Sequence, residues 1–175
     1  MHRIKELLRD DPYRYQILQW VANLHQSECY VAAGFIRNMV WDHLHGFCRT
    51  ALNDVDVIYF DPLSTVTEKE LLARLNSAAP MLNWQVKNQA LMHIRNSDKP
   101  YLSIADAIDF WPEKETAVAV KLEGNEEITV IAPFGVESLF AGLISHNPKR
   151  TKAVFSARIQ TKQWLEKWPD LMLAK

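Results

Sequence analysis

The sequence predicts an α/β protein of the α+β kind, in which helices flank one mixed β-sheet. Three observations predict this class: short apolar runs alternate with stretches of helical periodicity, a glycine separates the first such run from the next helix, and a Gly-Asn pair divides two later strand-like segments. With 175 residues and 48% hydrophobic content, the chain is long enough to bury one core. We therefore expect a single domain over 1–175, with a C-terminal helical segment, about 149–175, packed on it.

The first half of the chain is expected to contribute two helices and two strands. Apolar residues at helical spacing predict a helix over 14–25, and a short apolar run predicts a buried strand over 28–33. The next helix starts just past Gly34 and stops near Gly46. Residues 54–60 alternate charged and apolar side chains before becoming wholly apolar, which predicts a strand.

The second half is expected to mix helices with a hairpin. Thr67 and Glu70 have the spacing of a capping box, so a helix begins there and ends before Pro80. Gly124-Asn125 lies between two strand-like runs and predicts a tight β-hairpin turn. The expected elements are a strand over 84–87, a short helix over 103–110, hairpin strands over 116–122 and 128–131, a helix carrying residues 139–144, and a helix over 152–168.

Composition excludes several classes of protein. Lys and Arg total 20 against 21 Asp and Glu, so no global field would hold a polyanion. The charged N-terminus does not resemble a signal peptide, and no apolar run approaches the ~20 residues that span a bilayer. The two cysteines form no metal-binding or disulfide pattern. We expect a cytoplasmic protein without a membrane partner.

The run Asp54-Val55-Asp56-Val57 is the main candidate for chemistry. Side chains two residues apart on a strand project from the same face, so both carboxylates can reach a divalent cation between them. Magnesium combines few protein carboxylates with phosphate oxygens, so such a pair suits a metal–triphosphate complex. The alternative is that the two acids simply face water at a strand end.

Gly34 favours the metal interpretation because it lies between a predicted strand and a predicted helix, twenty residues before Asp54. A glycine there lets a phosphate approach the backbone. The helix that follows presents unpaired N–H groups and the positive end of its dipole. The two features would then bind opposite ends of one ligand.

These motifs resemble the strand–glycine–helix–DxD signature of the nucleotidyltransferase superfamily, the fold of DNA polymerase beta. The segments 32–42, 54–57, 86–93 and 132–140 are most similar to a bacterial nucleotidyltransferase-like family, and the resemblance spans about residues 15–148. It implies transfer of a nucleoside monophosphate from a nucleoside triphosphate. Asp54 and Asp56 would be the catalytic metal ligands for Mg²⁺ or Mn²⁺. The acceptor, a small molecule, a protein or RNA, is left open.

The resemblance also implies a set of nucleotide-binding residues. Arg37 would clamp a phosphate, as in the arginine–aspartate pair of the tRNA-nucleotidyltransferase branch, with Asn38 in place of the acid. Phe35 follows Gly34 where most of the superfamily has glycine or serine. The full set implied by the matched segments is Gly34, Phe35, Arg37, Asn38, Lys87, Asn88 and His93.

Two functions other than nucleotidyl transfer stay open: a non-catalytic binding module and an RNA-binding protein. The superfamily uses a third carboxylate on a later strand, and the sequence offers Asp106, Asp109, Glu115, Glu123 and Glu127 without choosing among them. If none serves, the chain is a catalytically degenerate module that binds nucleotide or a macromolecular partner. A third class is RNA binding through the basic cluster of Lys149, Arg150, Lys152 and Arg158.

Overall fold

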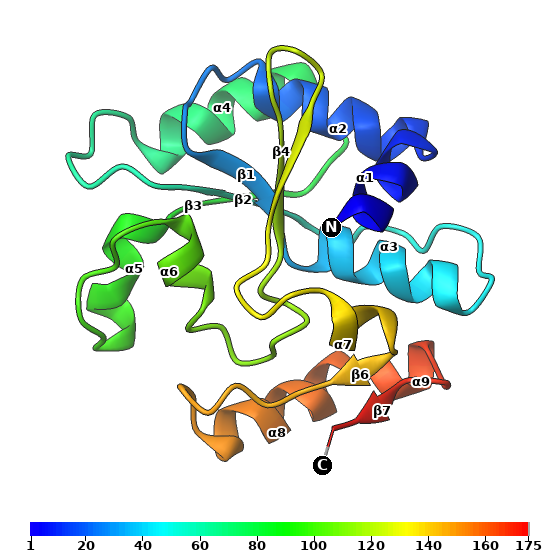
Figure 1. Cartoon of the computed structure of the whole chain (residues 1–175). Helices are drawn as coiled ribbons and strands as arrows, with labels where there is room; N and C mark the ends of the chain where they lie inside the picture. The colour runs from blue at the N-terminus through cyan, green and yellow to red at the C-terminus, as the bar shows by residue number, and fades with distance from the viewer. Residues whose placement is uncertain (175) are drawn as a thin grey trace.

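The computed structural model describes residues 1–174 (Figure 1). Within that range the helices are α1 (His2–Arg9), α2 (Pro12–Ala22), α3 (Gly34–Leu44), α4 (Glu68–Ala78), α5 (Gln89–Asn96), α6 (Ile104–Ile108), α7 (Glu137–Phe140), α8 (Lys152–Lys162) and α9 (Trp164–Lys167). The strands are β1 (Cys29–Ala32), β2 (Val55–Tyr59), β3 (Trp84–Asn88), β4 (Ala119–Leu122), β5 (Ile128–Ile131), β6 (Leu143–Ile144) and β7 (Met172–Leu173).

The central sheet has five strands in the order β3-β2-β1-β4-β5. It is mixed: β2 and β3 are parallel, and the other neighbours are antiparallel. At the end of β1, Ala32 lies opposite Asp56 on one side and Ala119 on the other. The predicted α/β class with one mixed, helix-flanked sheet is therefore confirmed.

The two faces of the sheet pack against different helices. Alternate residues such as Val31, Val57 and Val120 belong to the larger core, which includes side chains from α1 to α4. The residues between them, such as Ile58, pack in a smaller cluster with Ile104 and Ile108 of α6. Figure 1 shows α2 and α4 on one side of the sheet and α5 and α6 on the other. By strand alternation, Asp56 lies on the face of the smaller cluster.

Several local predictions are confirmed. The capping box is present: the Thr67 hydroxyl accepts the N–H of Glu70 at 3.2 Å, and the Glu70 carboxylate accepts the N–H of Thr67 at 2.8 Å. The hairpin forms from β4 and β5, although β4 begins at Ala119 rather than at 116.

Other predictions need correction. The helix expected through 139–144 ends at Phe140, because Gly142 adopts a positive φ of 68°, and Leu143–Ile144 instead pairs with β7. The helix expected over 152–168 is broken at Gln163, which has φ 51° and separates α8 from α9. The sequence prediction also missed α1 and α5.

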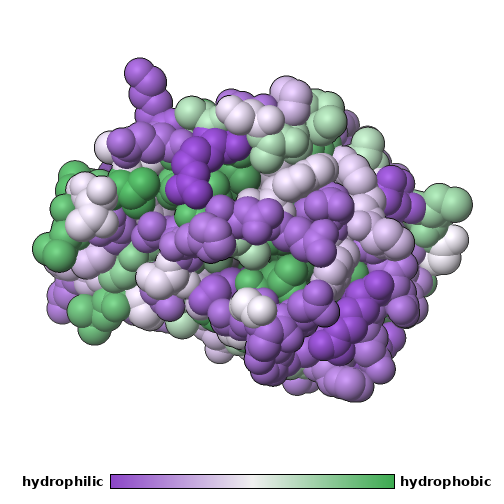
Figure 2. Space-filling model, turned by 90° about the horizontal axis from the view of Figure 1, so that it is seen from above, coloured by the Kyte–Doolittle hydropathy of each residue, from purple (hydrophilic) through white to green (hydrophobic). Residues whose placement is uncertain are grey.

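The surface seen from above is mainly hydrophilic, with apolar side chains in scattered groups (Figure 2). Through residue 174, none of the helices combines the length and hydrophobicity that crossing a bilayer requires. Cys29 is buried, Cys48 is exposed, and both are free thiols.

Candidate active site

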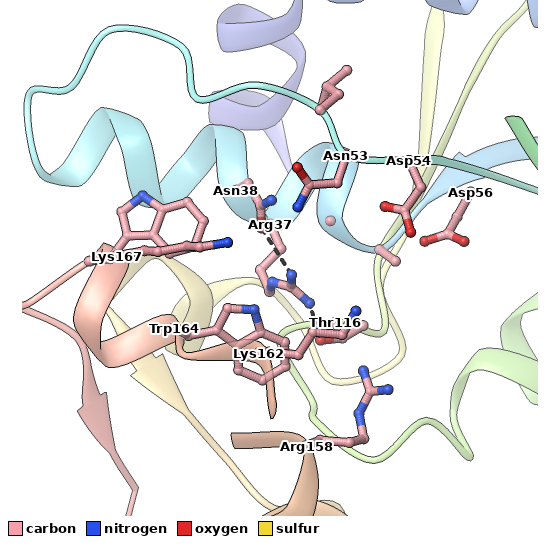
Figure 3. A pocket seen from close by; sticks show the side chains of 14 residues that line it. Arg37, Asn38, Asn53, Asp54, Asp56, Thr116, Arg158, Lys162, Trp164 and Lys167 are labelled. Atoms are coloured by element: carbon pink, nitrogen blue, oxygen red, sulfur yellow. Dashed lines mark hydrogen bonds between the residues drawn. The ribbon is translucent and has the colours of Figure 1, made fainter. Parts of the chain in front are cut away.

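The two aspartates of the DxD run lie together. Asp54 directly precedes β2, and Asp56 is the second residue of that strand. Both line one cavity of about 100 Å³, which we call the first cavity. Figure 3 shows their carboxylates side by side at one end of it. The side chains that line the first cavity include Arg37, Asn38, Asn53, Asp54, Asp56, Thr116, Arg158, Lys162, Trp164, Lys167 and Trp168.

The turn between β1 and α3 brings a helix start to the same cavity. Ala33 adopts φ 56°, an unfavourable conformation for a residue with a Cβ, and its N–H donates to the carbonyl of Val118 at 2.9 Å. Gly34 then begins α3 and lines the first cavity. A Cβ at Gly34 would lie 3.5 Å from the side chains of Arg37 and Asn38, an ordinary contact. Packing within the protein therefore does not require a glycine here, and the free space lies over the helix start.

Arg37 is a buried cation in the wall of this cavity, with 6% of its surface exposed. Its Nη1 donates to the Thr116 hydroxyl at 2.7 Å and its Nη2 to the Asn38 side-chain oxygen at 2.9 Å, while its Nε has no partner. Burial lowers the pKa of Arg37 to about 10, partly opposed by Glu113. Within residues 1–174 no carboxylate lies at ion-pair distance from it, so its charge is available to an anionic ligand.

The C-terminal helices form the opposite wall. The break at Gln163 turns Trp164 and Trp168 inward against Trp41, with ring centroids 5.7 and 5.2 Å apart. The Arg37 guanidinium stacks on Trp164 at 4.3 Å from the ring centroid. Trp41 is fully buried and belongs to the larger core.

This wall also brings basic side chains to the first cavity, as Figure 3 shows. Lys162 and Lys167 line it, and neither forms an ion pair with a residue of the described chain. Arg158 lines it too, but its guanidinium is held by the fully buried Glu113, at 2.6 Å from Nε to Oε1. No motif or spacing in the sequence marks Lys162, Lys167 or Thr116 as site residues.

The environment of Asp56 favours a bound cation. Burial, and then the neighbouring charge of Asp54, raise the pKa of the Asp56 carboxyl to about 6, while Arg37, Lys162 and Arg158 act in the opposite direction. Two adjacent carboxylates that repel each other in a partly buried site are hard oxygen donors. These residues therefore fit a divalent cation, which would relieve the repulsion.

Most candidates for a third carboxylate are engaged elsewhere, and Glu115 is engaged through only one of its two oxygens. Glu115 accepts the N–H of Ser145 at 2.7 Å through Oε2, while its buried Oε1 has no hydrogen-bond partner among the described residues. Asp106 accepts the N–H of Leu102 at 2.9 Å. Asp109, Glu123 and Glu127 form ion pairs with Lys149, Lys121 and Lys5. In the part of the chain that the structure describes, no three acidic, histidine or cysteine side chains are close enough to hold a metal ion. In the sheet, Ala32 of β1 lies between Asp56 of β2 and Ala119 of β4. At this level of the sheet, β4 therefore carries an alanine and not a carboxylate.

Four of the residues implied by the resemblance lie outside the first cavity. The Phe35 ring is buried in the main core, and Lys87 lines a neighbouring cavity while paired with Glu68 at 2.9 Å. The Asn88 side chain is buried; it caps α5 and holds the backbone of Asp61 through bonds of 3.1 and 2.8 Å. The His93 ring contacts the carbonyl oxygen of Ala90 at 2.7 Å.

The basic cluster proposed for RNA is largely neutralised. Lys149 pairs with Asp109, Arg150 with Asp98, and Arg158 with Glu113. Three of its four basic side chains are therefore engaged within the protein, and RNA binding by this cluster stays a prediction.

The sheet topology, the glycine-led helix and the adjacent aspartates define the chain as a protein of the nucleotidyltransferase class. A family model described as nucleotidyltransferase matches residues 19–173. The chain belongs to this nucleotidyltransferase family. No curated protein sequence matches it.

Solved structures agree with this assignment. An NMR structure described as a CCA-adding enzyme head domain has 28% identity and a TM-score of 0.84, with 100% of this chain and 96% of that chain covered. A CCA-adding enzyme in complex with CTP has 16% identity and a TM-score of 0.67, with 98% of this chain and 43% of that chain covered. The Thermotoga maritima CCA-adding enzyme complexed with tRNA has 16% identity and a TM-score of 0.65, with 98% and 42% covered. The chain thus spans less than half the length of these two enzymes, and its likeness to them is one of fold.

Proposed function

We propose that this protein is a metal-dependent enzyme that transfers a nucleoside monophosphate from a nucleoside triphosphate to an acceptor. The observation that carries the proposal is the first cavity itself: Asp54 and Asp56 share it with the helix start at Gly34 and with the free cations of Lys162 and Lys167. A metal-bound triphosphate needs carboxylates to hold the metal and cationic groups to bind the phosphates, and this cavity has the first at one end and the second at the other.

Asp54 and Asp56 would hold Mg²⁺ or Mn²⁺. When bound, such an ion neutralises charge on the triphosphate and favours departure of pyrophosphate. Asp56 must be ionised to act as a ligand, so protons compete with the cation at this raised pKa, and activity at limiting Mg²⁺ should fall as the pH drops toward about 6.

The remaining groups would position the phosphates. The start of α3 offers backbone N–H groups and the positive end of an 11-residue helix. Arg37 is fixed by Thr116, Asn38 and Trp164, so binding an anion requires little reordering of its side chain. An acceptor hydroxyl oxygen would attack the α-phosphorus as the bond from that phosphorus to the pyrophosphate oxygen breaks; pyrophosphate leaves to solvent, and the hydroxyl proton passes to water. In a loose transition state of this type, charge stabilisation contributes more than proton removal.

The partners that we propose are a nucleoside triphosphate and an acceptor that is a small molecule, a protein or RNA. The likeness to a CCA-adding enzyme in complex with CTP, and to one in complex with ATP, supports the nucleotide. The likeness to one complexed with tRNA supports RNA as one acceptor class.

The test is incubation with each of the four α-labelled nucleoside triphosphates, Mg²⁺ or Mn²⁺, and cell extract as a source of acceptors. We expect label to pass from one or more triphosphates into product, and Asp54→Asn plus Asp56→Asn to reduce the rate at least about 10³-fold, since charge stabilisation is the main catalytic effect. Asp10→Asn, an exposed carboxylate at the end of α1, is the matched control and should leave the rate unchanged. Unchanged transfer by the double variant would refute the assigned metal ligands.

A second candidate function is a nucleotide-binding module without turnover. The specific observation in its favour is that, within residues 1–174, no third acidic side chain lies close enough to Asp54 and Asp56 to share a metal ion with them. It predicts metal-dependent binding of a triphosphate in calorimetry, abolished in the double variant, with no labelled product under any condition.

A further inference from the structure

A second cavity adjoins the first one and differs from it in chemistry. It has a volume of about 250 Å³ and shares Ala33, Asp56, Thr116 and Arg158 with the first cavity. Its other walls are mainly apolar and include Ile58, Met92, Ala107, Trp111 and Pro112. Asp56 therefore lies where a polar, cation-lined space meets an apolar one.

Gln89 is a polar group of this second cavity with no hydrogen-bond partner in the described part of the chain, whereas Asn96 and Tyr101, which also line it, are hydrogen-bonded to each other at 3.3 Å. It is the first residue of α5, only 4% of its surface is exposed, and it lines the cavity. Its neighbour Asn88 provides the helix cap, so Gln89 is not needed for that role. Within residues 1–174, no hydrogen bond joins the Gln89 carboxamide to another group. A carboxamide that lines a cavity without a protein partner is available to hydrogen-bond a ligand or water there.

The charges around the second cavity exclude a phosphate there. Lys87 is paired with Glu68, and Arg158 with Glu113, so neither cation is free. The apolar walls suit a flat ring, and the carboxamide offers a donor and an acceptor side by side. A nucleobase combines these two properties, because its faces are apolar and its edge carries adjacent donors and acceptors.

We propose that the second cavity binds the nucleobase of the triphosphate, with the Gln89 carboxamide hydrogen-bonded to the base edge. The ring packs against Trp111 and Met92, the α-phosphate lies near Asp56, and the β- and γ-phosphates extend into the first cavity. This inference rests on the proposed function, because it divides the same nucleotide between the two cavities.

The experiment compares binding of the four nucleoside triphosphates with binding of inorganic tripolyphosphate, all with Mg²⁺, by calorimetry. Tripolyphosphate probes the first cavity alone. We expect wild-type protein to bind one or two of the nucleotides more tightly than tripolyphosphate. Gln89→Met keeps the side-chain length but removes the donor and acceptor, and should weaken the preferred nucleotide about tenfold while changing tripolyphosphate affinity less than twofold. Gln89→Glu, which keeps only acceptors, should weaken it too and alter the order of preference.

Gln85→Met is the matched control, because Gln85 lies on β3 with an exposed side chain outside both cavities. The nucleobase assignment fails if both Gln89 variants bind the nucleotides like wild type, or if wild-type protein binds tripolyphosphate as tightly as every nucleotide. The proposed function fails separately, if Asp54→Asn plus Asp56→Asn binds nucleotides with wild-type affinity. If that double variant loses binding while the Gln89 variants do not, only the nucleobase assignment is wrong.

Discussion

Asp56 and Asp61 lie near opposite ends of one strand and differ in electrostatic environment. Asp56, near the start of β2, has no hydrogen-bond donor among the described residues and faces the like charge of Asp54. Asp61, two residues after the strand, accepts the N–H groups of Leu63 and Val66 and the hydroxyl of Thr65 at 2.8 to 3.2 Å. The Asp61 carboxylate stabilises its turn, whereas the Asp56 carboxylate is left for something outside the chain to satisfy.

The two pKa shifts have opposite signs. Burial and Asp54 raise the pKa of Asp56 to about 6. Burial alone would raise the pKa of Asp61, but hydrogen bonds from Val66 and Thr65 outweigh it and lower that pKa. At neutral pH the ionised form of Asp61 therefore stabilises the fold, and the ionised form of Asp56 destabilises it. A residue that costs stability where no packing requires it is a candidate for function.

The largest effect on stability is expected for Asp61→Ala. This change leaves two backbone N–H groups and one hydroxyl without their acceptor, and it releases the turn that leads to α4. We expect the melting temperature at pH 7.5 to fall by several degrees, as measured by circular dichroism. Because the lowered pKa makes the contribution of Asp61 disappear in acid, the difference from wild type should shrink as the pH falls toward 3. A melting temperature equal to wild type at pH 7.5 would contradict the assigned role.

The second-largest effect on stability is expected for Asp56→Asn, and it is an increase. Asp56→Asn removes a partly buried charge, so the variant should be more stable than wild type by about 1 to 3 kcal/mol at pH 8. Wild-type Asp56 takes up a proton in the folded state between about pH 6 and pH 4, so the advantage should vanish over that window. Urea unfolding at pH 8 and pH 4 tests both points. A variant less stable than wild type at pH 8 would mean that the Asp56 carboxylate has a stabilising partner within the fold.

The parts of the site that the sequence predicts are those set by local geometry. Asp54 and Asp56 share a face because strand side chains alternate, and Gly34 reaches the same cavity because a strand–glycine–helix turn is a local structure. The fold class follows from periodicity in the same way. Each of these features is contained within a few neighbouring residues.

The remaining parts depend on tertiary packing. Segments distant in the sequence dock against α3 and bring four further side chains to the cavity, those of Thr116, Lys162, Trp164 and Lys167. No spacing in the sequence marks that contact. Gln163 is a non-glycine residue in a left-handed conformation, so the helix break that orients Trp164 carries no composition signal. Asn88 lies in a segment that resembles the family, yet its side chain binds within the protein, which shows that a shared segment can reflect capping rather than ligand contact.

The smallest expected effect is the rise in melting temperature on adding a divalent cation, which should depend on Asp56 but not on Asp61. A divalent ion that binds only the folded protein stabilises it by RT ln(1 + [L]/Kd), or about 1.4 kcal/mol at ten times Kd. We expect Mg²⁺ or Mn²⁺ at pH 8 to raise the melting temperature of wild type and of Asp61→Ala by about 3 to 5 °C, and to leave Asp56→Asn unchanged. Differential scanning fluorimetry with matched ionic strength measures this, because added sodium chloride controls for general screening. If the melting temperature of Asp56→Asn rises as much as that of wild type, the cation binds elsewhere. The destabilisation of the fold by ionised Asp56 would then have no functional explanation.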